Sequence, residues 1–165
     1  MRRLAVFMVL AACAALGVVW WTEHELGIMP CELCLWERWP WRGVLAGGVI
    51  AATLPVRWGR QVLWLCAPML VAGIGLSLCH GGVEWGWWPS PLPACHAPHI
   101  SGQTLAERLA SMPLLPSKPC DAPTYLVPGL PLSMTVMGGL YALFVLVVLV
   151  LSLNRQKKEK RRIFH

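Results

Sequence analysis

The stretch LAVFMVLAACAALGVVWW, residues 4–21, contains no charged side chain and decides the fold class of this chain. As an α-helix it would extend about 27 Å, which is close to the thickness of the hydrocarbon core of a bilayer. A segment of this length and composition is typical of a transmembrane helix. The stretch therefore predicts a membrane protein rather than a soluble domain.

The composition of the whole chain agrees with a membrane location. Of the 165 residues, 56% are hydrophobic and only 13% are charged, and the mean hydropathy is +0.56. These values are typical of small polytopic membrane proteins and unusual for soluble domains. The formal net charge is +6, but the basic residues cluster beside apolar runs and form no folded soluble face for nucleic acid. We therefore expect membrane lipid, and no nucleic acid, among the partners.

Three further apolar runs follow the first one, at about residues 39–56, 62–79 and 134–153. The second run has the weakest signal and carries Arg42 near its start. The sequence therefore predicts an all-α membrane protein, a four-helix transmembrane bundle built from one domain over residues 1–165.

The distribution of Lys and Arg predicts the orientation of this bundle. Ten of the 14 Lys and Arg residues lie at the N-terminus, in the short loop at 57–60 and in the C-terminal tail. The loops at about 22–38 and 80–131 carry three. Because basic segments stay on the cytoplasmic side, both termini are expected in the cytoplasm and both of these loops outside it. The long second loop is expected to hold a short helix within residues 101–115, on the membrane surface or packed on protein.

The N-terminus allows a second interpretation. Arg2 and Arg3 precede an apolar stretch, as in secretory signals, and LAAC at residues 10–13 resembles the cleavage box of a lipoprotein. However, the apolar run continues for eight residues after Cys13. We therefore expect an uncleaved span.

The seven cysteines include four that lie in the more polar loops: Cys31, Cys34, Cys95 and Cys120. Cys13 and Cys66 instead fall inside apolar runs, where a thiol behaves as a small hydrophobic group. Because the predicted orientation places both loops outside the cytoplasm, the four loop cysteines share the compartment in which disulfides persist.

Cys31 and Cys34 form a CxxC pair at the edge of an apolar run. Such a pair can close a small disulfide ring, and one of its thiols often has a lowered pKa. The position at a membrane edge suggests dithiol oxidation coupled to something dissolved in the lipid. Arg38 follows one helical turn after Cys34, where its guanidinium would stabilise a Cys34 thiolate and could hydrogen-bond a polar oxygen of a ligand. Alternatively, Arg38 extends to lipid headgroups.

Two other uses of the CxxC pair stay open. It could be half of a zinc site that Cys95, His96 and His99 complete, in a membrane metal-binding or assembly protein. It could also form a purely structural disulfide. A c-type haem is not supported, because Leu35 rather than a histidine follows Cys34.

The segment PCELCLWER, residues 30–38, resembles the PCxLCxxER motif of the DsbB family of membrane thiol oxidases. The segment WPSP at residues 88–91, Cys120 and the four-span layout also match, so the resemblance covers essentially the whole chain. Members of this family reoxidise the periplasmic dithiol oxidase DsbA by means of quinone. The resemblance therefore implies a thiol:quinone oxidoreductase of the bacterial inner membrane that supports disulfide bond formation. It also implies ubiquinone or menaquinone as cofactor, a DsbA-type partner and no metal.

A related class, the vitamin K epoxide reductases, also combines four spans with a CxxC pair and quinone. That family usually places its CxxC at the start of the last core span, whereas residues 31–34 precede the second predicted span. The position of the pair therefore favours the DsbB family.

The resemblance implies a role for each of the four loop cysteines. Cys95 and Cys120 form a disulfide that meets reduced DsbA, and Cys95 is the sulfur that DsbA attacks. Cys31 then exchanges with Cys120, and Cys34, next to Arg38, reduces the quinone. The proline-rich segment before Cys95 is expected to stay extended and accessible to the partner.

Two further residues are expected at the quinone. Members of the family carry a histidine near the quinone at the outer end of the third span, and His80 and Glu84 occupy that neighbourhood here. The spacing from His80 to Cys95 departs from the family pattern. Both residues are expected to assist the quinone oxygens or proton transfer. The alternative is an interfacial His and Glu that contact no ligand.

Overall fold

The computed structural model describes residues 1–92, 95, 104–110, 118–126 and 129–163, and within these ranges it is all-helical with no strand. The helices follow in the order α1 (Arg2–His24), α2 (Glu32–Thr53), α3 (Val56–Glu84), α4 (Leu105–Ala110) and α5 (Met134–Ile163). The all-α class expected from the apolar runs is therefore confirmed.

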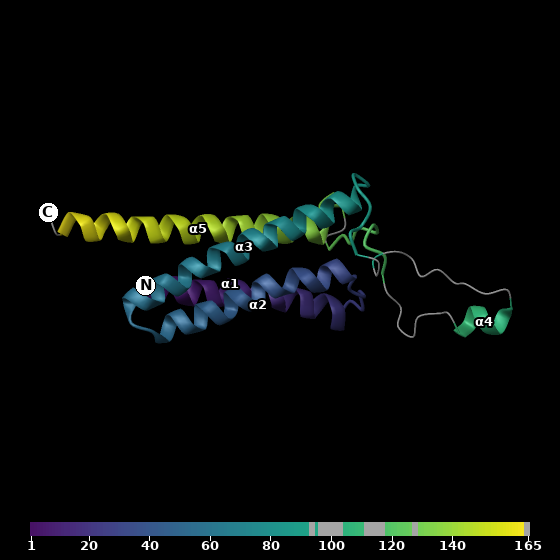
Figure 1. The fold of residues 1–165 in the computed structure, drawn as a ribbon, viewed down its shortest axis with the longest axis horizontal. Helices are drawn as coiled ribbons and strands as arrows, with labels where there is room; N and C mark the ends of the chain where they lie inside the picture. The colour runs from purple at the N-terminus through teal and green to yellow at the C-terminus, as the bar shows by residue number, and fades with distance from the viewer. Residues whose placement is uncertain (93–94, 96–103, 111–117, 127–128, 164–165) are drawn as a thin grey trace.

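The four long helices run side by side along roughly one direction (Figure 1). α2 packs against both α1 and α3, and α3 packs against α5. Both termini and the connection from α2 to α3 lie at one end of the molecule, whereas the α1–α2 loop and the connection that leads to α5 lie at the other (Figure 1). The start of α2 and the chain between α3 and α5, which hold the loop cysteines, therefore share one end.

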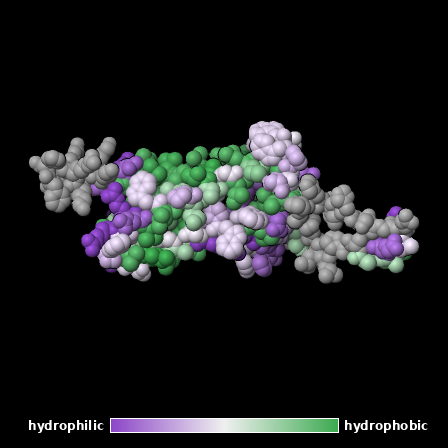
Figure 2. All heavy atoms as spheres, in the orientation of Figure 1, coloured by the Kyte–Doolittle hydropathy of each residue, from purple (hydrophilic) through white to green (hydrophobic). Residues whose placement is uncertain are grey.

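Among the described helices, three are long and apolar enough to cross a membrane: α1, α3 and the Met134–Gln156 part of α5. Their mean hydropathies are 2.3, 2.1 and 2.6. They correspond to the predicted runs at 4–21, 62–79 and 134–153, which the structure extends. Figure 2 shows the consequence, since hydrophobic residues cover the middle of the helices and hydrophilic residues gather at the end that holds the termini. Such an exposed apolar surface is typical of a protein that faces lipid.

The predicted span at 39–56 differs from the helix observed there. α2 begins earlier, at Glu32, and is not among the described helices with the composition of a span. Its charged residues include Glu37, Arg38 and Arg42, and the guanidinium carbon of Arg42 lies 5.3 Å from the centroid of the Trp39 ring. The four-span bundle therefore stays a prediction, although α2 lies between α1 and α3.

Glycines allow the helices to approach closely. A Cβ atom on Gly59 of α3 would lie only 2.8 Å from the backbone oxygen of Ala51 on α2. A Cβ on Gly48 of α2 would lie 2.9 Å from Cγ2 of Val9 on α1. Because backbone atoms cannot move aside as a flexible side chain can, Gly59 in particular is needed for the close packing of α2 on α3.

The expected helix within residues 101–115 is observed in part. α4 covers Leu105–Ala110, while residues 101–103 and 111–117 lie outside the described residues. Thr104 and Glu107 form a reciprocal capping arrangement at its start, because the side chain of each accepts a hydrogen bond from the backbone N–H of the other, at 3.3 and 3.2 Å. None of the α4 residues is buried. Its position on a membrane surface stays a prediction.

Candidate active site

The CxxC pair forms the N-terminus of α2. Cys31 is the N-cap residue, and its Sγ accepts a hydrogen bond from the backbone N–H of Cys34 at 3.3 Å. The Sγ atoms of Cys31 and Cys34 also share a hydrogen bond and lie 2.8 Å apart. Both thiols are free in this structure. A small movement of either side chain would bring the sulfurs to bonding distance.

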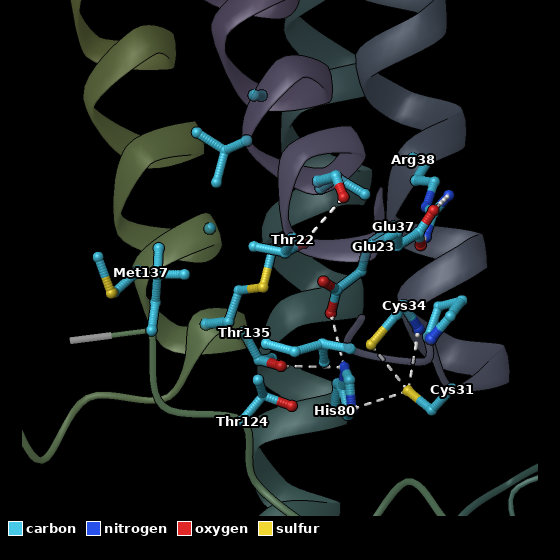
Figure 3. A pocket seen from close by; sticks show the side chains of 18 of the residues that line it. Thr22, Glu23, Cys31, Cys34, Glu37, Arg38, His80, Thr124, Thr135 and Met137 are labelled. Atoms are coloured by element: carbon cyan, nitrogen blue, oxygen red, sulfur yellow. Dashed lines mark hydrogen bonds and ion pairs between the residues drawn. The ribbon is translucent and has the colours of Figure 1, made fainter. Parts of the chain in front are cut away.

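His80 of α3 faces this pair from the neighbouring helix (Figure 3). Its Nε2 lies 3.5 Å from the Sγ of Cys31. Its Nδ1 lies 3.0 Å from Oε1 of Glu37 on α2 and 3.2 Å from Oγ1 of Thr135 on α5. The ring is only 2% exposed. Because Glu37 and Thr135 hold Nδ1, the ring is fixed with Nε2 directed at the sulfur.

The surroundings of Cys31 favour its thiolate. The hydrogen bond with the Cys34 thiol and, to a smaller extent, His80 together lower the pKa of Cys31 to about 4 against the opposing effect of burial. The N-cap position adds to this effect, because the N-terminus of a helix favours negative charge. Cys31 is therefore the thiol of this pair that is poised to act as a nucleophile.

Arg38 lies one turn further along α2, but it turns toward α1. Its Nη1 donates to Oε2 of Glu23 at 3.2 Å, and its Nη2 donates to the other carboxylate oxygen. The expected stabilisation of a Cys34 thiolate by Arg38 stays a prediction, because the hydrogen-bond partner of the guanidinium is Glu23 and that of the Cys34 sulfur is Cys31. The Nε of Arg38 is buried and has no hydrogen-bond partner among the described residues.

Glu84 belongs to the same group of side chains as His80. Its Oε1 accepts a hydrogen bond from Oγ1 of Thr135 at 3.0 Å and lies 3.9 Å from Nε2 of His80. Its Oε2 is buried and, within the described part of the chain, has no partner. The structure thus brings His80 and Glu84 together beside the CxxC pair, as expected, while their contact with quinone stays a prediction.

Three residues of the site were not singled out from the sequence. Glu23 lies just after the first apolar run, and Glu37 lies inside the PCELCLWER segment. Because the chain has few acidic residues, an acidic residue at the edge of an apolar run could have indicated a place in the site for both. Thr135 carries no such signal. It reaches the site only because the start of α5 packs against the C-terminal end of α3.

A cavity of about 380 Å³ adjoins these residues. Its polar wall includes Cys34, Arg38, His80 and Glu84, and much of the remainder is apolar, with residues such as Val18. The buried Nε of Arg38 and Oε2 of Glu84, which have no hydrogen-bond partner among the described residues, therefore offer a donor and an acceptor beside an apolar space. A largely apolar ligand with a few polar oxygens suits such a cavity.

The second cysteine pair lies next to the first. Cys95 and Cys120 form a disulfide with their Cα atoms 5.0 Å apart, as the resemblance implied. Both residues are buried in one hydrophobic cluster with Cys31, Leu33 and Val83. The loop disulfide and the CxxC pair are therefore neighbours at the end of the molecule where α2 begins and α3 ends.

The proline-rich segment is exposed at Trp87, Pro89 and Pro91, as expected, but it leads into a buried Cys95. Its side chain is only 3% exposed, and Leu92 of the proline-rich segment packs against the same cluster. The zinc site considered with Cys95, His96 and His99 also loses a ligand, because the sulfur of Cys95 is in a disulfide and not a thiolate. His96 and His99 lie outside the described residues.

Comparisons with known proteins agree on one family. The family described as "Disulfide bond formation protein DsbB" matches residues 1–152. Disulfide bond formation protein B of Haemophilus ducreyi is 30% identical over 150 residues, which cover 86% of this chain and 82% of that protein. The protein of the same name from Escherichia coli K12 is 27% identical over 148 residues, covering 87% and 82%. The one from Pasteurella multocida is 24% identical over 173 residues, covering 99% and 94%. No solved structure matches the chain.

Proposed function

Because the chain belongs to the DsbB family of disulfide bond formation proteins, we propose that it is a thiol:quinone oxidoreductase. It oxidises a periplasmic dithiol protein of the DsbA type and passes two electrons to a membrane quinone. One observation carries the proposal: the Cys95–Cys120 disulfide shares a buried cluster with Cys31, while Cys34 lines the adjoining cavity. To pass electrons from a protein dithiol to a lipid-soluble acceptor, the two cysteine pairs must lie close enough to exchange disulfides, and one of them must adjoin the site of the acceptor.

The location is proposed on the same basis. The family and the three span-like helices indicate a bacterial inner membrane protein. Both termini lie at the end opposite the cysteine pairs (Figure 1). With the basic segments in the cytoplasm, as the distribution of Lys and Arg favours, the cysteine pairs face the periplasm.

The electrons enter at the loop disulfide. A thiolate of the partner attacks Sγ of Cys95, the Cys95–Cys120 bond breaks, and Cys120 leaves as a thiolate. That thiolate attacks Cys31 in the oxidised CxxC pair, and Cys34 leaves as a thiolate. The second thiol of the partner then releases Cys95, which attacks Cys120 and frees Cys31. The partner has gained a disulfide, the CxxC pair has gained two electrons, and two protons are released.

The pattern of bonded and free cysteines in the structure corresponds to the end of this exchange. The loop disulfide is closed, and Cys31 and Cys34 are free thiols. The exchange also requires movement, because a partner thiolate cannot reach Sγ of Cys95 while that residue is 3% exposed. Binding of the partner must therefore lift the segment that carries Leu92 and Cys95 away from the cluster around Val83.

The cavity residues suit a quinone. Arg38 can donate from Nε to a quinone oxygen while its other nitrogens stay bound to Glu23. His80 and Glu84 can hold protons at Nε2 and at the unpartnered Oε2. A bound quinone supplies the acceptor for two electrons. Ubiquinone and menaquinone both carry the ring oxygens that these side chains would bind.

Anaerobic reduction of quinone by the purified protein, with a reduced DsbA-type donor, tests the proposal. We expect turnover by the wild-type protein and by Cys66→Ser, since the Cys66 thiol is free and lies in the separate hydrophobic core between the helices. Cys95→Ser should lose turnover with the protein donor and still retain bound quinone. Turnover by Cys95→Ser would refute the relay, and a wild-type protein that reduces no quinone would refute the function.

A further inference from the structure

We propose that the reduced CxxC pair and His80 form a site for a thiophilic divalent cation, with Zn²⁺ as its physiological representative. The three ligand atoms are Sγ of Cys31, Sγ of Cys34 and Nε2 of His80, and they all lie within 4.8 Å of one another. Two thiolates and one imidazole are a donor set that zinc takes in proteins, with the fourth position left for water or substrate. This site differs from the one that the sequence suggested, because it needs none of Cys95, His96 or His99.

The distance between Cys31 and His80 already fits a metal of this kind. Bonds of about 2.3 Å to sulfur and about 2.0 Å to nitrogen at a tetrahedral angle place the two ligand atoms roughly 3.5 Å apart. The observed distance from Sγ of Cys31 to Nε2 of His80 is 3.5 Å. The two sulfurs are 2.8 Å apart and would need to separate to roughly 3.8 Å for a tetrahedral ion. Cys34 lines the cavity and can make this adjustment by rotating its side chain.

The neighbours of His80 already have the arrangement that supports a metal ligand. A ligating histidine commonly binds a carboxylate through its other ring nitrogen, which orients the ring toward the ion. Here Glu37 holds Nδ1 at 3.0 Å, with Thr135 at 3.2 Å, and Nε2 is left to face the sulfurs. The helices therefore fix the imidazole in the orientation that a cation would require.

The fourth position is open to a group beyond these three ligands. Oε1 of Glu84 lies 3.9 Å from Nε2 of His80, and the buried Oε2 of the same carboxylate has no partner in the described part of the chain. A water molecule from the cavity could occupy the position instead. Because two thiolates neutralise a divalent ion, such a complex would also bring no net charge into this buried region.

The metal and the disulfide exclude each other. Both use the sulfurs of Cys31 and Cys34, so an ion can bind only to the reduced pair and displaces the protons that remain on the two thiols. A bound ion would keep these sulfurs from electron transfer and from exchange with the loop disulfide. Zinc at this site would therefore stop the proposed relay in its reduced state, and its binding can be measured without quinone or partner.

The test is an anaerobic titration of the reduced protein, freed of reductant, with Co²⁺ and then Zn²⁺. Thiolate-to-cobalt charge-transfer absorption reports the ligands, and Zn²⁺ should abolish it by displacement. The variant Cys95→Ser/Cys120→Ser is titrated beside the wild type, so that loop thiols cannot supply ligands. We expect one ion per chain in both reduced proteins and none in protein whose CxxC pair is oxidised. Equal binding by the oxidised pair would overturn the proposal.

Variants of His80 and of its partner Glu37 test whether the ion binds at Cys31, Cys34 and His80. Glu37→Gln should weaken Zn²⁺ binding about 10- to 100-fold, as the loss of such supporting carboxylates commonly does. His80→Gln should weaken it more, whereas His24→Gln should bind as the wild type does, because His24 is exposed and stacks on Trp20. Undiminished affinity in both His80→Gln and Glu37→Gln, with unchanged helical circular dichroism, would overturn the proposal.

Discussion

Replacing Glu23 by Gln should impair the acceptor site without altering any cysteine. The Glu23 carboxylate accepts one hydrogen bond from Nη1 of Arg38 at 3.2 Å and another from Nη2, which leaves Nε as the buried donor in the cavity wall. The two side chains are only 15% and 21% exposed, so water screens the pair weakly. Glutamine keeps the size of the side chain and removes its negative charge and one acceptor.

The size of the effect follows from these contacts. A hydrogen bond to a charged group contributes about 1.5–3 kcal/mol. A loss of about 2 kcal/mol corresponds to roughly a 30-fold change in the equilibrium that holds Arg38 in place, since about 1.4 kcal/mol is a factor of ten. If quinone binding depends on that position, the apparent KM for quinone should rise about 10- to 30-fold while kcat at saturating quinone changes little.

The assay is steady-state quinone reduction at saturating reduced donor. Glu25→Gln is the matched control, because Glu25 is the exposed residue that follows the last turn of α1. Arg38→Ala should raise the apparent quinone requirement several-fold by removing the donor itself. An unchanged KM in Glu23→Gln together with a raised KM in Arg38→Ala would refute the idea that Glu23 positions Arg38. Unchanged kinetics in Arg38→Ala would remove Arg38 from the site altogether.

Three further predictions concern the thiols and the helix packing. Because the pKa of Cys31 is lowered to about 4, its rate of alkylation in the reduced protein should stay nearly constant as the pH falls from about 8 to about 5. In Cys34→Ala, which lacks the largest cause of that lowering, the rate should fall with pH, and a wild-type rate that falls in the same way would contradict the assignment. Gly59→Ala should cost about 1–3 kcal/mol and lower the thermal unfolding midpoint in detergent, since the new Cβ would meet a backbone oxygen at 2.8 Å. Gly75→Ala, where nothing lies within 4 Å, is its control, and equal midpoints would show that α2 and α3 can move apart at no cost. Aerobically purified protein should carry two disulfides by alkylation and mass measurement, and four free loop thiols would contradict the relay.

The second helix shows where prediction from sequence reaches its limit. Hydropathy treats each charged residue of a span as a cost, and it therefore places the start of this span at residue 39. In the structure α2 begins at Glu32, because Glu37 and Arg38 are paired inside the protein. Their partners, His80 and Glu23, lie 43 and 15 residues away in the chain. A local window of sequence contains no information on such pairing.

The amino-acid sequence by itself determined the helical class, the positions of the apolar helices and the residues that carry the chemistry. These features depend on local composition and spacing, as in residues 4–21 and in the Cys31–Cys34 pair. Only the tertiary structure decided which side chains meet. The Cys31 sulfur faces His80, Glu23 pairs with Arg38, and Cys95 is buried. Contacts across helices depend on the rotation and depth at which the helices pack, and the pKa of a thiol depends on its nearest neighbours, so neither follows from the order of residues alone.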